Sequence, residues 1–185
     1  MFKTIVNAWK VAELRRKILF TIMVIIVFRI GSVIPVPFLN IEALQGLMGN
    51  LQEGNTLLAY LDTLSGGAFA QATLFAMSVQ PYIQSSIIMQ LMTVALPALE
   101  ALQKEGEEGR KKLTAITRYV TIALGLMQGT GYYLFLRNSK YSGTPIVKYV
   151  DGAEGVFTAI VIVLAFTAGT ALMMWLGEQI NVKGV

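Results

Sequence analysis

The sequence contains no cysteine and no histidine among its 185 residues. Thiol nucleophiles, disulfides, thiolate or imidazole metal ligands and histidine-based proton transfer are therefore excluded. Charged residues are also scarce, at 14% of the chain, whereas hydrophobic residues make up 55%. Soluble domains usually contain roughly 45–50% apolar residues. The composition thus removes the parts of most enzyme sites and indicates a membrane protein.

Long apolar runs are typical of helices that cross a bilayer, which requires about 20 mainly apolar residues. Residues 18–34, 73–96, 119–136 and 156–176 meet this requirement. The first run follows a basic stretch, but it exceeds the roughly 7–15 residues of a signal-peptide core and no small-residue cleavage site follows it. We therefore predict a retained first span within an all-α, multi-pass transmembrane helical bundle.

Lys and Arg are absent between residues 35 and 72. They gather instead near the amino terminus and in the segment 97–118, and cytoplasmic loops are the ones that retain such residues. We therefore expect both termini and the segment 97–118 in the cytoplasm, with residues 1–17 forming a basic amphipathic segment at the membrane surface. The basic residues concerned are Lys3, Lys10, Arg15, Arg16, Lys17, Lys104, Arg110, Lys111, Lys112 and Arg118.

The expected external segment 35–72 is too apolar for a solvated linker. It opens with "PVPFLN", whose two prolines are expected to stop the first helix. Further on, Ser65, Gly66 and Gly67 interrupt any regular helix. Irregular backbone at membrane depth survives only where protein or a water-filled cavity surrounds it. The sequence therefore predicts a segment that folds back into a cavity.

The stretch "MSVQPYIQSSIIMQ", residues 77–90, places proline, glutamine and serine inside an apolar region. Pro81 removes a helical hydrogen bond and predicts a kink. Val79, Ile83, Ser86 and Gln90 fall on one helical stripe. The polar side chains either bond neighbouring helices, as is common in membrane bundles, or line an aqueous path. Composition leaves both interpretations open.

The segment "TLSGGAFAQATLFAMSVQPYIQSSIIMQLMTVALPALEALQKEGEEGRKK" resembles the SecY family of protein-translocation channels. "FRIGSVIPVP", "TRY" and "MWLGEQI" fit the same family in the same order. The resemblance implies a channel of two five-helix halves, which opens across the membrane for secretory chains and sideways into lipid for membrane spans. It also implies that this chain is the amino-terminal portion, ending at the start of a fifth span.

The resemblance further implies roles for particular residues. Val79 and Ile83 match the central pore ring. Residues 57–71, the plug segment, match the plug that blocks the channel from outside, and they are centred on Leu64, Ser65, Gly66, Gly67 and Ala68. The lateral-gate positions are matched by Gln84, Ile87, Gln90 and Gln128.

The partners implied by the resemblance are the small subunits SecE and SecG, the motor ATPase SecA, the ribosome, signal sequences, translocating polypeptides and lipid of the cell inner membrane. No cofactor and no catalytic residue are expected. Arg29, inside the first predicted span, needs a partner in protein or water because a charge there is costly. Two other classes stay open from the residues alone: half of a secondary transporter with a broken-helix substrate site, and an intramembrane enzyme. The intramembrane-enzyme class is disfavoured because the sequence lacks histidine, cysteine and paired acidic residues inside the predicted spans.

Overall fold

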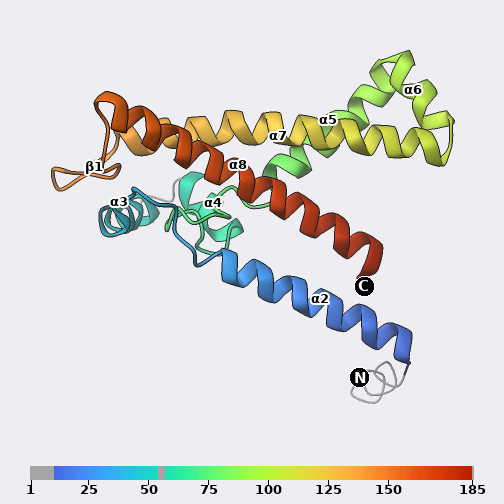
Figure 1. Ribbon diagram of the computed structural model, residues 1–185, viewed down its shortest axis with the longest axis horizontal. Helices are drawn as coiled ribbons and strands as arrows, with labels where there is room; N and C mark the ends of the chain where they lie inside the picture. Colours follow the sequence, from blue (N-terminus) through green and yellow to red (C-terminus); the bar gives the residue numbers. More distant parts are fainter. Residues whose placement is uncertain (1–10, 54–56, 185) are drawn as a thin grey trace.

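The computed structural model describes residues 11–53 and 57–184 and is mainly helical (Figure 1). The predicted helical fold class is confirmed, with the addition of a short antiparallel hairpin. Its elements are α2 (Ala12–Gly31), α3 (Ile41–Glu53), α4 (Leu57–Leu64), α5 (Gln80–Ala95), α6 (Pro97–Lys104), α7 (Glu107–Asn138), β1 (Lys140–Tyr141), β2 (Thr144–Pro145) and α8 (Gly152–Lys183).

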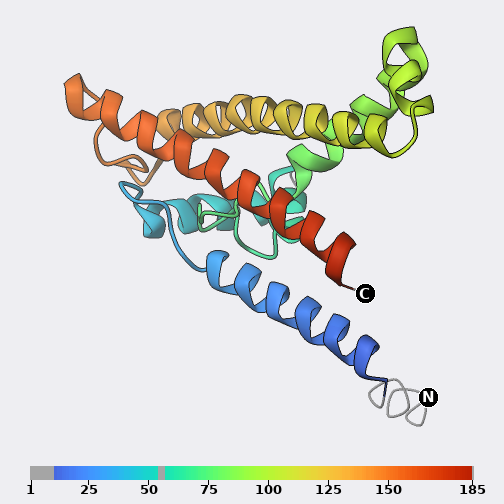
Figure 2. The ribbon, with the colours of Figure 1, turned by 45° about the vertical axis from the view of Figure 1, so that its right-hand side comes forward.

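The long helices α7 and α8 lie against each other along much of their length (Figures 1 and 2). Small residues allow this close approach. A Cβ atom at Gly125 would lie 3.3 Å from Cγ2 of Thr170, and one at Gly129 would lie 3.5 Å from Cβ of Phe166. Gly125 and Gly129 in the third predicted span therefore serve helix packing.

The first helix ends at Gly31, before the prolines that were expected to stop it. Gly31 contacts the ring of Phe75, and any side chain there would collide with that ring. After the helix the chain forms turns and two isolated bridges: Pro35 bridges Thr73, and Leu39 bridges Val147. The prolines thus lie in a segment that pairs with other parts of the chain.

The second expected span does not begin at Thr73, because residues 65–79 form turns and α5 starts at Gln80. The predicted kink at Pro81 is wrong. Pro81 lies in the first turn of α5, where a helix has no intrahelical use for the missing N–H. The sharp bend comes instead at Leu96, where α5 and α6 meet at 101°.

The segment 97–118 is helical rather than a loop, because α6 and the start of α7 occupy most of it. The chain turns at Gly106, which has a φ of 78°. Nζ of Lys112 lies 3.3 Å from Oε2 of Glu105 across this turn, with both side chains about half exposed. The charged run "KEGEEGRKK" thus forms an exposed helical hairpin.

Helix α3 and the hairpin were not predicted. They pack beside the end of α7, and this region holds much of the core, including Leu44, Leu136 and Ile146, each 0% exposed. Backbone bonds join the segments: the Asn40 N–H donates to the Ile146 carbonyl (2.8 Å), and the Lys148 N–H donates to the Phe38 carbonyl (3.0 Å).

Among the described residues, α8 alone is long and apolar enough to cross a membrane, and α5 with α6 qualifies if the bent pair counts as one span. The number of four spans therefore stays a prediction. Residues after Leu176 continue α8 as far as Lys183, so the expected start of a fifth span is not a separate helix. Of the predicted amino-terminal segment, residues 1–10 lie outside the described residues, and Ala12 onward belongs to α2.

Candidate functional site

The turns between α4 and α5 fold against α7 and enclose a cavity of about 520 Å³. Its walls come from the plug segment, from the turns that follow it, from the start of α5 and from the second half of α7. Most of the wall is apolar, and three glutamine side chains add amide groups. The lining residues are Leu64, Ser65, Phe69, Ala76, Met77, Ser78, Gln80, Gln84, Gln128, Tyr132 and Phe135.

The plug segment is interrupted where the sequence predicts. Helix α4 ends at Leu64, and the following glycines have left-handed φ values of 65° at Gly66 and 86° at Gly67. Such values are readily adopted only by glycine. The helix interruption expected from the sequence is therefore confirmed.

Asp62 and Ser65 organise the turn through hydrogen bonds. The Ala70 N–H donates to Oδ1 of Asp62 (2.7 Å), and the Phe69 N–H donates to Oγ of Ser65 (2.9 Å). Oγ of Ser65 in turn donates to the carbonyl of Asp62 (2.9 Å). Residues 62–70 thus form a small folded body whose polar groups are bonded to one another.

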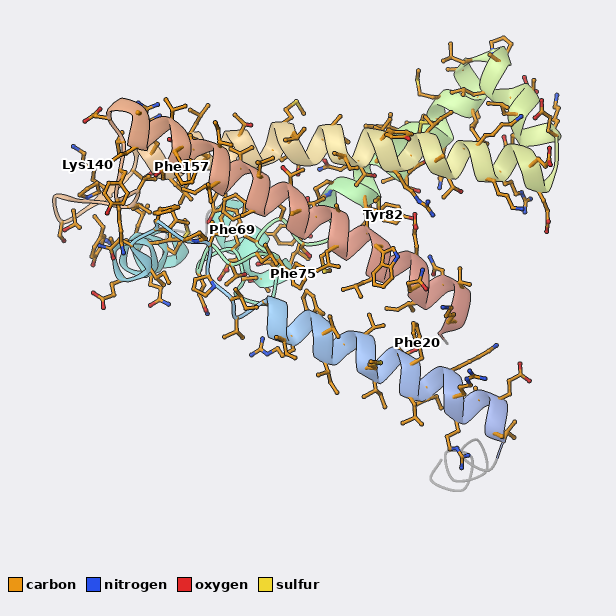
Figure 3. All side chains as sticks on the ribbon, viewed as in Figure 1. Phe20, Phe69, Phe75, Tyr82, Lys140 and Phe157 are labelled. Atoms are coloured by element: carbon orange, nitrogen blue, oxygen red, sulfur yellow. The ribbon has the colours of Figure 1, made fainter. Side chains whose placement is uncertain are left out.

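Phe69, labelled in Figure 3, joins this body to Tyr132 on α7. The Tyr132 hydroxyl donates to the Phe69 carbonyl at 2.7 Å. The two rings stack with centroids 4.4 Å apart, and the Phe166 ring backs Tyr132 with centroids 5.1 Å apart. Ser65, Ala68 and Phe69 are buried, whereas Leu64 is 49% exposed and Gly66 is exposed.

The two predicted pore-ring residues face different surroundings. Val79 precedes α5 and lines a separate cavity of about 360 Å³ between α2 and α8, together with Phe28 and Met173. Ile83 is 49% exposed on α5. In this chain the structure does not bring the two side chains into one cavity, so their ring role stays a prediction.

The gate residues are partly brought together. Nε2 of Gln128 on α7 donates to Oε1 of Gln84 on α5, at the wall of the 520 Å³ cavity. Ile87 is 51% exposed, and Gln90 is exposed beside a polar cavity that Arg110 also lines. On the same helix, Oγ of Ser85 donates to the Thr117 carbonyl at 2.8 Å. At Ser85, therefore, a polar side chain does bond a neighbouring helix.

Sequence reasoning missed an ion pair between α7 and α8. Nε of Arg118 donates to Oε1 of Glu178 at 2.8 Å, and Nη2 of Arg118 lies 2.7 Å from Oε2 of Glu178. This two-point geometry is the strong form of an arginine–carboxylate pair, and the hydrogen bond and charge of Glu178 raise the pKa of Arg118. The motifs "TRY" and "MWLGEQI" contain the two residues, but their separation along the chain gave no sign of contact.

Tyr132 and Asp62 were also missed, because neither belongs to a recognisable pattern. Arg29, for which a partner was sought, is exposed on α2 and forms no ion pair within the part of the chain that the structure describes. His, Cys, Asp and Glu side chains do not gather into a possible metal site among the described residues either.

A helix long and apolar enough to cross a membrane, beside a folded-back turn segment that lines a cavity, is typical of helical membrane proteins. Comparison with known families makes the assignment more specific. The SecY family model matches residues 73–185. The chain belongs to the SecY family.

Individual relatives agree with this assignment over the whole chain. Proteins named protein translocase subunit SecY are 46% identical over 187 residues in Bacillus subtilis (strain 168) and 41% identical over 186 residues in Streptomyces scabiei. The alignments cover 100% of this chain but only 41% and 43% of those relatives. The chain thus spans less than half the length of the curated relatives it matches.

Proposed function

We propose that this chain forms the plug-bearing part of a protein-conducting channel. Such a channel translocates secretory proteins across the membrane and releases membrane proteins sideways into lipid. The observation that carries the proposal is the match to SecY relatives along the entire chain. The folded turn segment beside a cavity adds a physical reason, because it supplies a body that can fill a pore and leave it.

At rest, the plug segment and an apolar ring keep the channel closed to ions. A translocating chain presents every kind of side chain, so an apolar ring can surround it without binding any of them tightly. A hydrophobic constriction also resists ions by dewetting. Val79 and Ile83 are the residues proposed for this ring, and the exposed face of Ile83 is available to helices outside this chain.

Lateral release requires an interface that opens and closes again. The Gln84–Gln128 bond, with Ile87 and Gln90 further along α5, is proposed as part of that gate. Hydrogen bonds between membrane helices average only about 0.6 kcal/mol in measured cycles. Uncharged amides therefore join the helices weakly enough for the gate to part.

We place the chain in the cell inner membrane with its amino terminus in the cytoplasm. Figure 1 supports the expectation that both termini and the segment 97–118 lie on one side of the membrane. The start of α2, the turn between α6 and α7, and the end of α8 all lie at one end of the molecule. Arg15, Arg16, Lys111, Lys112 and Lys183 lie in these parts. The β1–β2 hairpin lies at the opposite end.

The energy for transport is proposed to come from the motor SecA or from a translating ribosome, with SecE and SecG as small membrane subunits. This chain itself is proposed to be a passive conduit without catalytic residues. Half of a secondary transporter is not favoured as an alternative, because the relatives are named as translocase subunits.

The proposal is tested with a hybrid channel. This chain replaces the matching 41% of the Bacillus subtilis relative, and the hybrid is reconstituted with its partner subunits and motor in vesicles. We expect a secretory precursor to become protease-protected inside the vesicles only when the motor hydrolyses ATP. A hybrid that assembles normally but protects no precursor would refute the proposal, and uptake of a defined solute instead would revive the transporter alternative.

A further inference from the structure

We propose that Tyr132 is a positioning residue that holds the plug segment in its resting place. Its hydroxyl bonds the Phe69 carbonyl at 2.7 Å and its ring stacks on the Phe69 ring at 4.4 Å. The inference rests on the proposed channel function and adds to it the contact that sets how readily the plug leaves. Strength of this contact would determine how strong a signal sequence must be to open the channel.

Most hydrogen bonds of residues 62–70 join these residues to one another or to the residues that follow them directly. Ala70 and Gly67 both donate backbone N–H groups to Asp62, and Phe69 donates to Ser65. The N–H and the hydroxyl of Thr73 both donate to the Ala68 carbonyl. The Tyr132 bond instead joins this body to α7, across a separation of 63 residues. A body bonded mainly to itself can move as a unit once such an outward bond breaks.

Residues 62–70 can hinge at their carboxyl end. This end is fixed to the segment after α2, because the Val36 N–H donates to the Ala72 carbonyl (3.1 Å) and the Leu74 N–H donates to the Ile34 carbonyl (3.0 Å). Ala72 has a left-handed φ of 42°, which is uncommon for a residue with a side chain. Rotation about this point would swing Phe69 away from Tyr132 and leave the bridge to residues 34–36 in place. It would also break the bonds that the Thr73 N–H (3.1 Å) and hydroxyl (3.2 Å) donate to the Ala68 carbonyl.

Tyr132 cannot move together with the plug segment. It is 6% exposed and lies on the continuous helix α7. The Phe166 side chain, 0% exposed on α8, fills the space next to its ring. One turn earlier, Gly129 brings α7 close to Phe166. The helix pair therefore fixes the hydroxyl in space, and plug movement must break its bond.

Removing only the hydroxyl is a clean test because it leaves no orphaned acceptor. The Phe69 carbonyl also accepts the Ala72 N–H at 3.0 Å. Tyr132→Phe therefore keeps the stacked ring and a bonded carbonyl, and folding should survive. From the usual net contribution of one hydrogen bond, the ratio of displaced to seated plug should rise about three- to tenfold.

The experiment uses the complete channel with its partner subunits in planar bilayers. Resting ion conductance and passage of a precursor with a defective signal sequence are measured for the natural channel and for Tyr132→Phe. Tyr133→Phe is the matched control, because Tyr133 is the next residue on α7 and is also buried, at 5% exposure. Phe69→Leu is a second variant, which keeps the carbonyl bond and removes the stacking.

We expect higher conductance and easier passage of the defective precursor in Tyr132→Phe and in Phe69→Leu, with Tyr133→Phe equal to the natural channel. Equal conductance in all variants, or equal increases at Tyr132 and Tyr133, would overturn the inference. A normal precursor serves as the separate readout of the proposed function. If the natural channel fails to translocate it, the function is wrong; if it succeeds and the variants stay tight, only the role of Tyr132 is wrong.

Discussion

The helix pair α7–α8 and the plug segment are built on opposite principles. The helices are continuous, and glycines at their contact let side chains of one helix fit against the backbone of the other. The plug segment is a short helix followed by turns, held mainly by bonds within itself. Close packing between two elements makes them hard to separate, whereas a self-bonded body needs few contacts broken to move. This difference supports the proposal that the helix pair is a fixed wall and the plug segment a detachable part.

The largest effect is expected from disturbing the contact between α8 and the turns before α5. Gly169 on α8 contacts the Leu74 backbone, and any side chain there would collide with the Leu74 carbonyl oxygen. Overpacking of this kind usually costs about 1–3 kcal/mol, so Gly169→Leu should greatly lower the abundance of folded channel. Gly177→Leu on the same helix is the control, because a Cβ at Gly177 has no neighbour within 4 Å. Thermal unfolding of the purified complexes measures both; equal midpoints would contradict the packing argument.

The next largest effect is expected from deleting most of the plug segment. Deleting residues 60–70 from the complete channel should leave membrane insertion intact, because α7 and α8 keep their mutual packing. Resting ion conductance should rise, and the need for a strong signal sequence should relax. Planar-bilayer recordings and a precursor assay measure the two effects. An idle channel that stays as tight as before would show that the plug segment is not a stopper.

A smaller effect is expected at the proposed ring. Ile83→Asn should fold nearly normally if the exposed Ile83 face borders an aqueous constriction, and the wetted barrier should leak ions. Leu136→Asn on α7 is the packing control, because Leu136 is 0% exposed and an unbonded buried amide costs about 1–3 kcal/mol on mutational scales. Val79→Asn tests the other ring residue, whose cavity lies between α2 and α8.

Conductance and abundance are compared for these three variants. Leak in Ile83→Asn and Val79→Asn, with normal abundance, would support a shared ring. If Val79→Asn alone folds poorly, Val79 packs against neighbouring helices and is not part of the ring. Misfolding of both ring variants like the control, with no leak in the surviving complexes, would end the ring hypothesis.

The smallest effect on function is expected from a pair of cysteines that report topology. These 185 residues lack cysteine, so single substitutions at Thr144 in the hairpin and at Gln103 in α6 can be labelled without background from this part of the channel. Both positions are exposed. In intact cells an impermeant thiol reagent should label position 144 and not 103, while transport stays normal. The reverse labelling would invert the proposed orientation.

The sequence itself determined the elements that depend on local composition. Apolar runs predicted helical segments that lie within α7 and α8. Ser65, Gly66 and Gly67 predicted the end of α4, because glycine adopts left-handed backbone without the steric cost that other residues meet. Motifs in order along the chain predicted the family. These features follow from residues close together in the sequence, where periodicity and conformational preference act directly.

The tertiary structure alone decided how Pro81 is used and which distant residues meet. A proline is compatible with a kink or with the first turn of a helix, and the turns before Gln80 selected the second. The contacts of Tyr132 with Phe69 and of Arg118 with Glu178 join residues far apart in sequence. Such contacts depend on helix packing and on the path of the chain between helices, which leave no local pattern. The fixed wall could therefore be predicted in outline from the sequence, whereas the contact proposed to hold the plug segment appears only when α7 and the turn after α4 are brought together.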